Sequence, residues 1–245
     1  MSFISDAAWT VRRLMNRAGI DVVPFRIARH PIARRRHLFN QNEIDLVVDV
    51  GANCGQYGSF LRQVGYTGRI CSYEPLSSAY AALSAAAASD PQWDVHHIGL
   101  GETEGNATLN IAQNSESSSI LPMLPAHLRS YPESRYVATE TVPMTTLAEV
   151  LGGFPTPSRI FVKVDTQGYE RQVIEGAGDA IANVRGVQLE MSRVSLYDGE
   201  SLMPEMINFM KDKGLILMSI EPGSSDPQTG QLLQLDGLFF RPSSP

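Results

Sequence analysis

The chain of 245 residues is poor in the features that crosslink a protein or anchor it in a membrane. Its only cysteines, Cys54 and Cys71, are too few for a disulfide framework or a four-cysteine zinc site. No run of about 18 apolar residues occurs, which excludes a transmembrane helix. The N-terminus also lacks the apolar core of a signal peptide. We therefore expect a cytoplasmic protein.

Acidic residues outnumber basic ones, and the formal net charge of −6 disfavours a general nucleic-acid-binding protein. The exception is residues 1–40, which hold eight arginines against only Asp6 and Asp21. Apolar side chains accompany these arginines at roughly helical spacing: Phe3, Ile4, Trp9, Leu14 and Met15. Such a basic helical segment could contact the inner face of an anionic membrane, or it could dock on the rest of the protein.

Apolar runs that end at glycine or proline alternate with helical patterns along most of the chain. The runs predict strands at 45–51, 69–74, 95–98, 159–165, 187–191, 215–221 and 232–241. The patterns between them predict helices at 55–64, 77–89, 169–175 and 202–213. Strand–helix–strand repeats need crossovers, so the sequence predicts an α/β fold with helices on both faces of a mostly parallel seven-stranded sheet. The last two strands lack a helix between them and should pair antiparallel.

One region interrupts this alternation. Residues 107–111 and 136–142 have strand character, and the polar, proline-containing stretch between them is typical of an irregular loop. Long loops in compact domains usually cover a binding site. We therefore expect a basic helical segment at 1–40, followed by a domain at 41–245 with a lid or insert at about 105–150.

The first predicted strand ends in a glycine-rich motif that runs from Asp49 to Tyr57. Its spacing is G-x-x-x-G-x-x-G, and a dinucleotide pyrophosphate favours G-x-G-x-x-G instead. An acidic residue before the glycines suits the amino-acid end of S-adenosylmethionine. Glu74 ends the second strand and could accept hydrogen bonds from both hydroxyls of a ribose. The alternative interpretation of the motif is a plain strand–helix turn.

Six segments together resemble the FkbM-type methyltransferases: 49–57, 73–75, 142–147, 163–170, 188–192 and 232–239. The resemblance covers about residues 40–241, and its most specific block is Lys-x-Asp-x-Gln-Gly-Tyr-Glu at 163–170. It implies a class I, Rossmann-like methyltransferase fold that uses S-adenosylmethionine. It also implies O-methylation, often of sugar hydroxyls in glycolipids or secondary metabolites. The cofactor-binding residues it implies are Asp49, Gly51, Ala52, Asn53, Gly55, Tyr57, Glu74, Pro75, Leu76, Gly101 and Asp165.

Two carboxylates are the leading candidates for catalysis. Asp165 ends the fourth strand, beside the expected methyl group, and Glu190 ends the neighbouring fifth strand. They could serve as general base and orienting group, or hold Mg²⁺ through their oxygens. Two structural alternatives remain open at this point. Asp165 could cap the following helix, and Glu190 could form a buried ion pair with Arg193 or Lys163.

The remaining candidates lie in or near the expected lid. His127 could act as a base, although a solvent-exposed loop histidine is its alternative. Ser118, Gln167 and Tyr197 are the candidate contacts to the acceptor, which we expect to be a hydroxyl-bearing sugar or glycolipid. A homodimer is compatible with the sequence. Two other functions stay open, an NAD-dependent oxidoreductase and a non-catalytic nucleoside-binding module.

Overall fold

The computed structural model describes residues 3–155 and 158–242, and side chains from Trp9 onward. The side chains of Phe3 and Ile4 lie outside this range. The chain divides into two compact units, the first ending at Gln41 and the second beginning at Asn42. The sequence places this boundary one residue earlier. The first unit holds helices α1 (Phe3–Arg17) and α2 (Pro31–Gln41).

The second unit is built on a seven-stranded sheet with the order β3-β2-β1-β7-β8-β10-β9. All pairings from β3 to β8 are parallel, and β10 pairs antiparallel with both β8 and β9. This confirms the predicted sheet, including its antiparallel end. The strands are β1 (Leu46–Val50), β2 (Arg69–Tyr73), β3 (Trp93–His96), β7 (Ile160–Val164), β8 (Val184–Ser192), β9 (Ile216–Pro222) and β10 (Gln234–Phe240).

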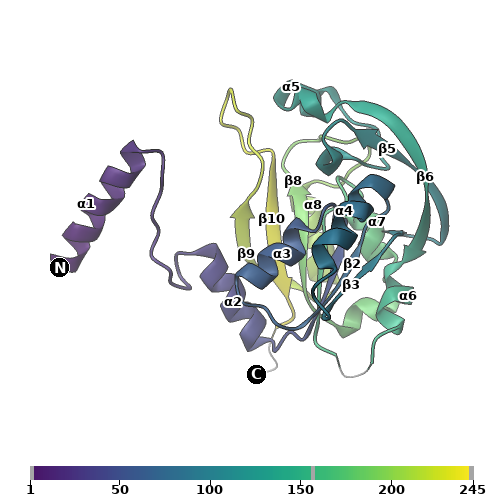
Figure 1. Ribbon diagram of the computed structural model, residues 1–245, viewed down its shortest axis with the longest axis horizontal. Helices are drawn as coiled ribbons and strands as arrows, with labels where there is room; N and C mark the ends of the chain where they lie inside the picture. The colour runs from purple at the N-terminus through teal and green to yellow at the C-terminus, as the bar shows by residue number, and fades with distance from the viewer. Residues whose placement is uncertain (1–2, 156–157, 243–245) are drawn as a thin grey trace. The chain divides into compact units, whose positions relative to one another are not determined.

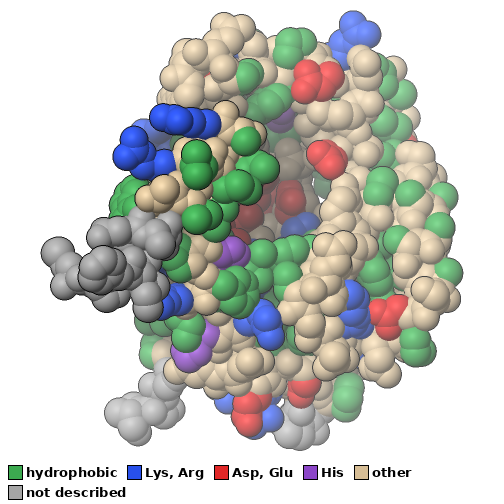
Figure 2. All heavy atoms as spheres, turned by 60° about the vertical axis from the view of Figure 1, so that its left-hand side comes forward, with side chains coloured by type: hydrophobic (Ala, Val, Ile, Leu, Met, Phe, Trp, Pro, Cys, Tyr) green, Lys and Arg blue, Asp and Glu red, His purple; other side chains and the backbone are tan. Residues whose placement is uncertain are grey.

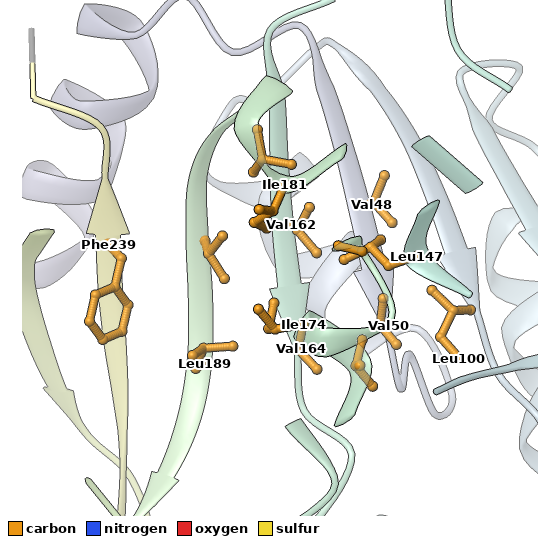
Figure 3. Close-up of a cluster of buried hydrophobic side chains, with 14 of the residues drawn as sticks. Val48, Val50, Leu100, Leu147, Val162, Val164, Ile174, Ile181, Leu189 and Phe239 are labelled. Atoms are coloured by element: carbon orange, nitrogen blue, oxygen red, sulfur yellow. The ribbon is translucent and has the colours of Figure 1, made fainter. Parts of the chain in front are cut away.

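Helices cover this sheet on both faces (Figure 1). They are α3 (Gln56–Gln63), α4 (Ser77–Ala87), α6 (Leu147–Gly152), α7 (Glu170–Glu175), α8 (Met203–Asp212) and the 3₁₀ segment η3 (Gly178–Asn183). Because strand residues alternate between faces, Val48 and Val50 join one buried cluster with Val162 and Val164, against Ile174 of α7 (Figure 3). Each such buried aliphatic side chain contributes about 1.5–3 kcal/mol. This core fixes the level at which the strands end, and the candidate site lies there.

The interrupting region forms a second sheet with the order β4-β6-β5. Its strands are β4 (Gly99–Gly101), β5 (Gly105–Ala112) and β6 (Tyr136–Thr146), and β5 pairs antiparallel with β6. The stretch between β5 and β6, residues 113–135, is called the lid segment below. It is less irregular than expected, because it contains α5 (Pro125–Ser130) and the 3₁₀ turns η1 (Ser115–Ser117) and η2 (Pro132–Ser134). None of the helices in the described residues could cross a membrane.

Candidate active site

A row of buried polar side chains crosses four neighbouring strands at one level. The strand register places Asp49 of β1 beside Ser72 of β2 and Lys163 of β7, and Lys163 beside Gln188 of β8. Ser72 Oγ donates to Asp49 Oδ2 at 3.0 Å, and Tyr57 Oη donates to Gln188 Oε1 at 3.0 Å. Polar groups buried this deeply need such partners. The row underlies the glycine motif that follows β1.

Lys163 connects this row to the end of β7. Its Nζ lies 3.4 Å from Asp49 Oδ1 and 3.4 Å from Asp165 Oδ2, and it donates to the Gly51 carbonyl oxygen at 3.1 Å. Burial opposes the ammonium charge, but the carboxylates of Asp165 and Asp49 outweigh it and raise the pKa of Lys163. Burial raises the pKa of Asp49. The sequence suggested Lys163 only as a partner for Glu190.

The glycine motif turns sharply against the end of β7. Gly51, Asn53 and Gly55 all have positive φ angles, of 72°, 46° and 87°. A Cβ on Gly51 would lie 1.9 Å from the carbonyl oxygen of Asp165, so no other residue fits there without movement. The motif and the strand end that carries Asp165 are therefore in direct backbone contact.

Glu74 closes the other side of the motif, at the end of β2. Its Oε2 accepts from the backbone N–H of Asn53 at 2.8 Å, and its Oε1 accepts from the backbone N–H of Leu76 at 2.8 Å. Burial raises the pKa of Glu74 to about 7. Pro75 borders β4, because a Cβ on Gly99 would lie 3.3 Å from the Pro75 Cβ. The glycine motif, the Glu74 carboxylate and β4 therefore lie around the carboxyl ends of β1 and β2, where a nucleoside binds in folds of this kind.

Gly101 ends β4 close to this point. It is buried, and a Cβ there would lie 3.1 Å from both Met144 Cε and the ring of Tyr169. Ala52, also among the expected cofactor contacts, is buried within the glycine motif. The structure therefore gathers the expected cofactor residues around the ends of β1 and β2.

The two candidate carboxylates meet through an amide. Gln167 Nε2 donates to Asp165 Oδ1 at 2.8 Å and to Glu190 Oε2 at 2.6 Å, while Gln234 Nε2 donates to the same Glu190 oxygen at 2.7 Å. Burial raises the pKa of Glu190 well above its usual range, and the charge of Asp165 adds to this. The Asp165 side chain is 34% exposed and so remains accessible to an acceptor.

Both structural alternatives for these carboxylates are wrong. Helix α7 begins at Glu170, and Glu170 itself accepts from the backbone N–H groups of Thr166 and Gly168 at 2.8 and 3.2 Å. Asp165 therefore does not cap this helix. Lys163 pairs with Asp49 and Asp165, while Arg193 is exposed, so the polar partners of Glu190 are amides rather than a cation. Burial also raises the pKa of Glu170 to about 7.

The residues do not support a magnesium site. Within residues 3–155 and 158–242, no three histidine, cysteine, aspartate or glutamate side chains gather as metal ligands would. Magnesium needs oxygen ligands, and the group between Asp165 and Glu190 is the N–H donor of Gln167. The Gln167 amide donates hydrogen bonds to both carboxylates, at the place where the expected magnesium ion would have bound them.

Gln167 also links the carboxylates to the lid segment. Tyr197 Oη donates to Gln167 Oε1 at 2.8 Å and to the Ser117 carbonyl at 3.2 Å, and Ser119 Oγ donates to the Gln167 carbonyl at 2.7 Å. Tyr197 is fully buried, so it supports Gln167 from behind instead of facing an acceptor. Ser118, which the sequence suggested, accepts from the backbone of Ala112 at 3.1 Å.

His127 is not brought to the carboxylates. It lies on α5, is only 3% exposed, and meets the Tyr197 ring edge-on at 5.2 Å. Its interpretation as an exposed loop histidine is therefore wrong. Burial lowers its pKa, so the imidazole is neutral at physiological pH. The ring contacts of His127 are with Tyr131 and Tyr197, and neither is one of the two candidate carboxylates.

The molecule is hollowed at the centre of one face, with acidic and basic side chains deep in the hollow (Figure 2). Three chemical elements come together at the ends of β1, β2, β7 and β8: a glycine motif, an accessible carboxylate and a buried cation. Asp165 can accept a proton, and Lys163 holds the Asp165 side chain in place. This arrangement suits proton removal from a neutral group next to a bound nucleoside.

Comparison with known proteins gives a family match. The methyltransferase FkbM domain matches residues 49–217. Similar solved structures include an rRNA methylase from Streptococcus thermophilus (TM-score 0.46, 11% identity, 87% of this chain and 98% of that one). A second is magnesium protoporphyrin IX methyltransferase from Synechocystis (TM-score 0.45, 8% identity, 87% of this chain and 85% of that one). A third is precorrin-6y C5,15-methyltransferase from Geobacter metallireducens (TM-score 0.44, 10% identity, 84% of this chain and 87% of that one). No curated protein matches the chain.

Proposed function

The chain belongs to the FkbM methyltransferase family, whose members depend on S-adenosylmethionine, and we propose that it methylates a hydroxyl oxygen with Asp165 as general base. The observation that carries this proposal is the placement of Asp165. Its carboxylate is partly exposed and is fixed by Lys163 and Gln167, and its backbone carbonyl lies against Gly51 of the glycine motif. Family membership also removes the NAD-dependent oxidoreductase alternative.

The cofactor residues fit this role. The turn at Gly51 and Gly55, with positive φ angles, puts no side chain at these positions between the backbone and a ligand, and Glu74 is the acid placed to accept from ribose hydroxyls. Asp49 and Tyr57 anchor the motif to the sheet, Asp49 through its ion pair with Lys163 and Tyr57 through its hydrogen bond to Gln188. When bound, S-adenosylmethionine supplies a methyl group already activated by its sulfonium. The protein therefore mainly supplies alignment and a proton acceptor.

Asp165 accepts the hydroxyl proton as the acceptor oxygen takes the methyl group. The O–H bond breaks, an O–C bond forms, and the sulfur keeps the electron pair of the broken S–C bond. Lys163 orients Asp165 and places a positive charge beside it, and Gln167 fixes its other oxygen. Burial and the neighbouring charge of Asp165 raise the pKa of Glu190 well above its usual range, which favours the uncharged form of Glu190 beside the base.

We further propose a sugar hydroxyl, on a glycolipid or related glycoside, as the acceptor. The polar surroundings of Asp165 support this, since its partly exposed carboxylate is a hydrogen-bond acceptor that a sugar hydroxyl can reach. This acceptor also agrees with the habit of the family that the sequence resembles.

The test is a pair of measurements on Asp165→Asn. Transfer of labelled methyl from S-adenosylmethionine to a panel of glycosides should fall by about 10²–10⁴-fold. Thermal stabilisation by S-adenosylhomocysteine should remain, since the amide keeps the shape of the site. Asp212→Asn, an exposed change at the end of α8, is the matched control. Full activity of Asp165→Asn would refute the general base. A wild-type chain that binds cofactor but methylates none of the panel would favour a binding module.

A further inference from the structure

The segment from Trp9 to Arg29, here called the basic apolar segment, combines charge with exposed apolar surface. It holds five arginines and one acid, Asp21. Seven of its large apolar side chains are between 42% and 62% exposed: Trp9, Val11, Leu14, Ile20, Val22, Phe25 and Ile27. Exposed apolar residues scattered singly over a surface are ordinary, but so many within one short segment point to an interaction surface.

Helix α1 sorts these residues by side. Leu14 and Met15 lie three and four residues after Val11, so these side chains share one side of the helix. Arg13 and Arg17, four residues apart, share another side. The described part of α1 is therefore amphipathic within itself, with a cationic and an apolar side.

The residues after α1 are held to the helix. Arg12 Nε donates to Asp21 Oδ1 at 2.7 Å, and the Arg12 guanidinium lies 5.8 Å from the centre of the Trp9 ring. This contact neutralises the only acid of the basic apolar segment. The other four arginines of the segment have no acidic residue of the same segment to offset their charge.

We propose that the basic apolar segment binds the surface of an anionic lipid bilayer. Arginines adjacent to apolar side chains match a surface of anionic headgroups over hydrocarbon, where each basic residue adds electrostatic attraction. A nucleic acid would match the arginines but leave Val11, Leu14 and Phe25 in water. This inference does not depend on the proposed acceptor, because it concerns a part of the chain outside residues 49–217.

Vesicle flotation of the full chain tests the proposal. The chain should float with phosphatidylcholine vesicles containing about one third phosphatidylglycerol, and stay behind with phosphatidylcholine alone. Arg13→Gln with Arg17→Gln should lower the partition coefficient about thirty-fold, or about 2 kcal/mol at 1.4 kcal/mol per tenfold. Val11→Ser with Leu14→Ser should also weaken binding, because it removes apolar area from the lipid contact.

Met218→Ser with Ile220→Ser is the matched control, because these side chains are similarly exposed on β9, outside the segment. It should float like the wild-type chain, and circular dichroism should show every variant folded. Absence of flotation would overturn the proposal. So would equal losses in the control, or binding to a DNA duplex that competes with vesicles and ignores the Val11 and Leu14 substitutions.

Discussion

A single buried side chain, Lys163, sets the charge balance of the site. It is buried between Asp49 and Asp165, at 3.4 Å from each. Lys163→Met should lower the free energy of unfolding at pH 7 by about 3–5 kcal/mol, since it leaves buried carboxylate charge without its partner. Urea denaturation measures this, with the exposed Lys211→Met as control. A loss no larger than that of the control would mean that the ion pairs contribute nothing.

Glu74 gives the site a pH dependence. Burial raises its pKa from 4.5 to about 7, so in its proposed role as ribose acceptor Glu74 must lose its proton before both oxygens can accept hydrogen bonds. Affinity for S-adenosylhomocysteine should therefore rise as pH increases through about 7, and fall by up to about tenfold per unit below it. Calorimetry at pH values on both sides of about 7 measures this.

The linked effect on stability has the opposite sign. The folded state holds this proton more tightly than the unfolded chain, so the Glu74 contribution to stability falls as pH rises from 4.5 toward about 7. Glu74→Gln should lower the affinity for S-adenosylhomocysteine and remove its dependence on pH. An unchanged slope in that variant would assign the pH dependence to another group.

The residues that sequence analysis missed share a physical reason. Asp165, Glu190 and Gln167 were found because strand ends and a specific motif point to them. Lys163 and Gln188 act through register between β1, β7 and β8, and those strands are far apart in the sequence. An apolar run with one internal polar residue does not reveal which strand lies beside it.

At the level of elements, the turn after β1 depends on the absence of a side chain at Gly51. Gly51→Ala should destabilise the fold by more than about 2 kcal/mol, because its Cβ would meet the Asp165 carbonyl at 1.9 Å in addition to the left-handed strain. Gly65→Ala is the control, with a φ of 90° and nothing within 4 Å of an added Cβ. It should cost only about 1–2 kcal/mol. Equal costs in thermal denaturation would contradict the steric argument.

Elements with strong local patterns were predictable, and two helices within the interrupting region were not. The seven strands and the helices α3, α4, α7 and α8 followed from apolar runs and helical periodicity. Helix α5 was missed because six residues between prolines show no periodicity, although Pro125 suits a first turn. Helix α6 was also missed, yet its signal was present, because Thr146 accepts from the backbone of Glu149 at 3.2 Å.

At the scale of the whole molecule, the N-terminal residues should be dispensable for folding. Between Trp9 and Val22 only Arg12 and Met15 are half-buried, and the others are exposed. Removing residues 1–22 should therefore shift the thermal midpoint by less than about 2 °C. Calorimetry of both chains measures the shift. A drop of more than about 5 °C would show that these residues stabilise the fold.

The contact between Gly51 and the Asp165 carbonyl has one more consequence. With no room for a side chain between them, the two segments behave mechanically as one solid piece. No hinge lies between the glycine motif, which is the proposed site of the methyl donor, and Asp165, which is the proposed general base. Their relative geometry is therefore established when the protein folds, and no closing motion has to recreate it in each turnover. Slow motions that limit turnover would then belong to the lid segment and to the arrival of the acceptor.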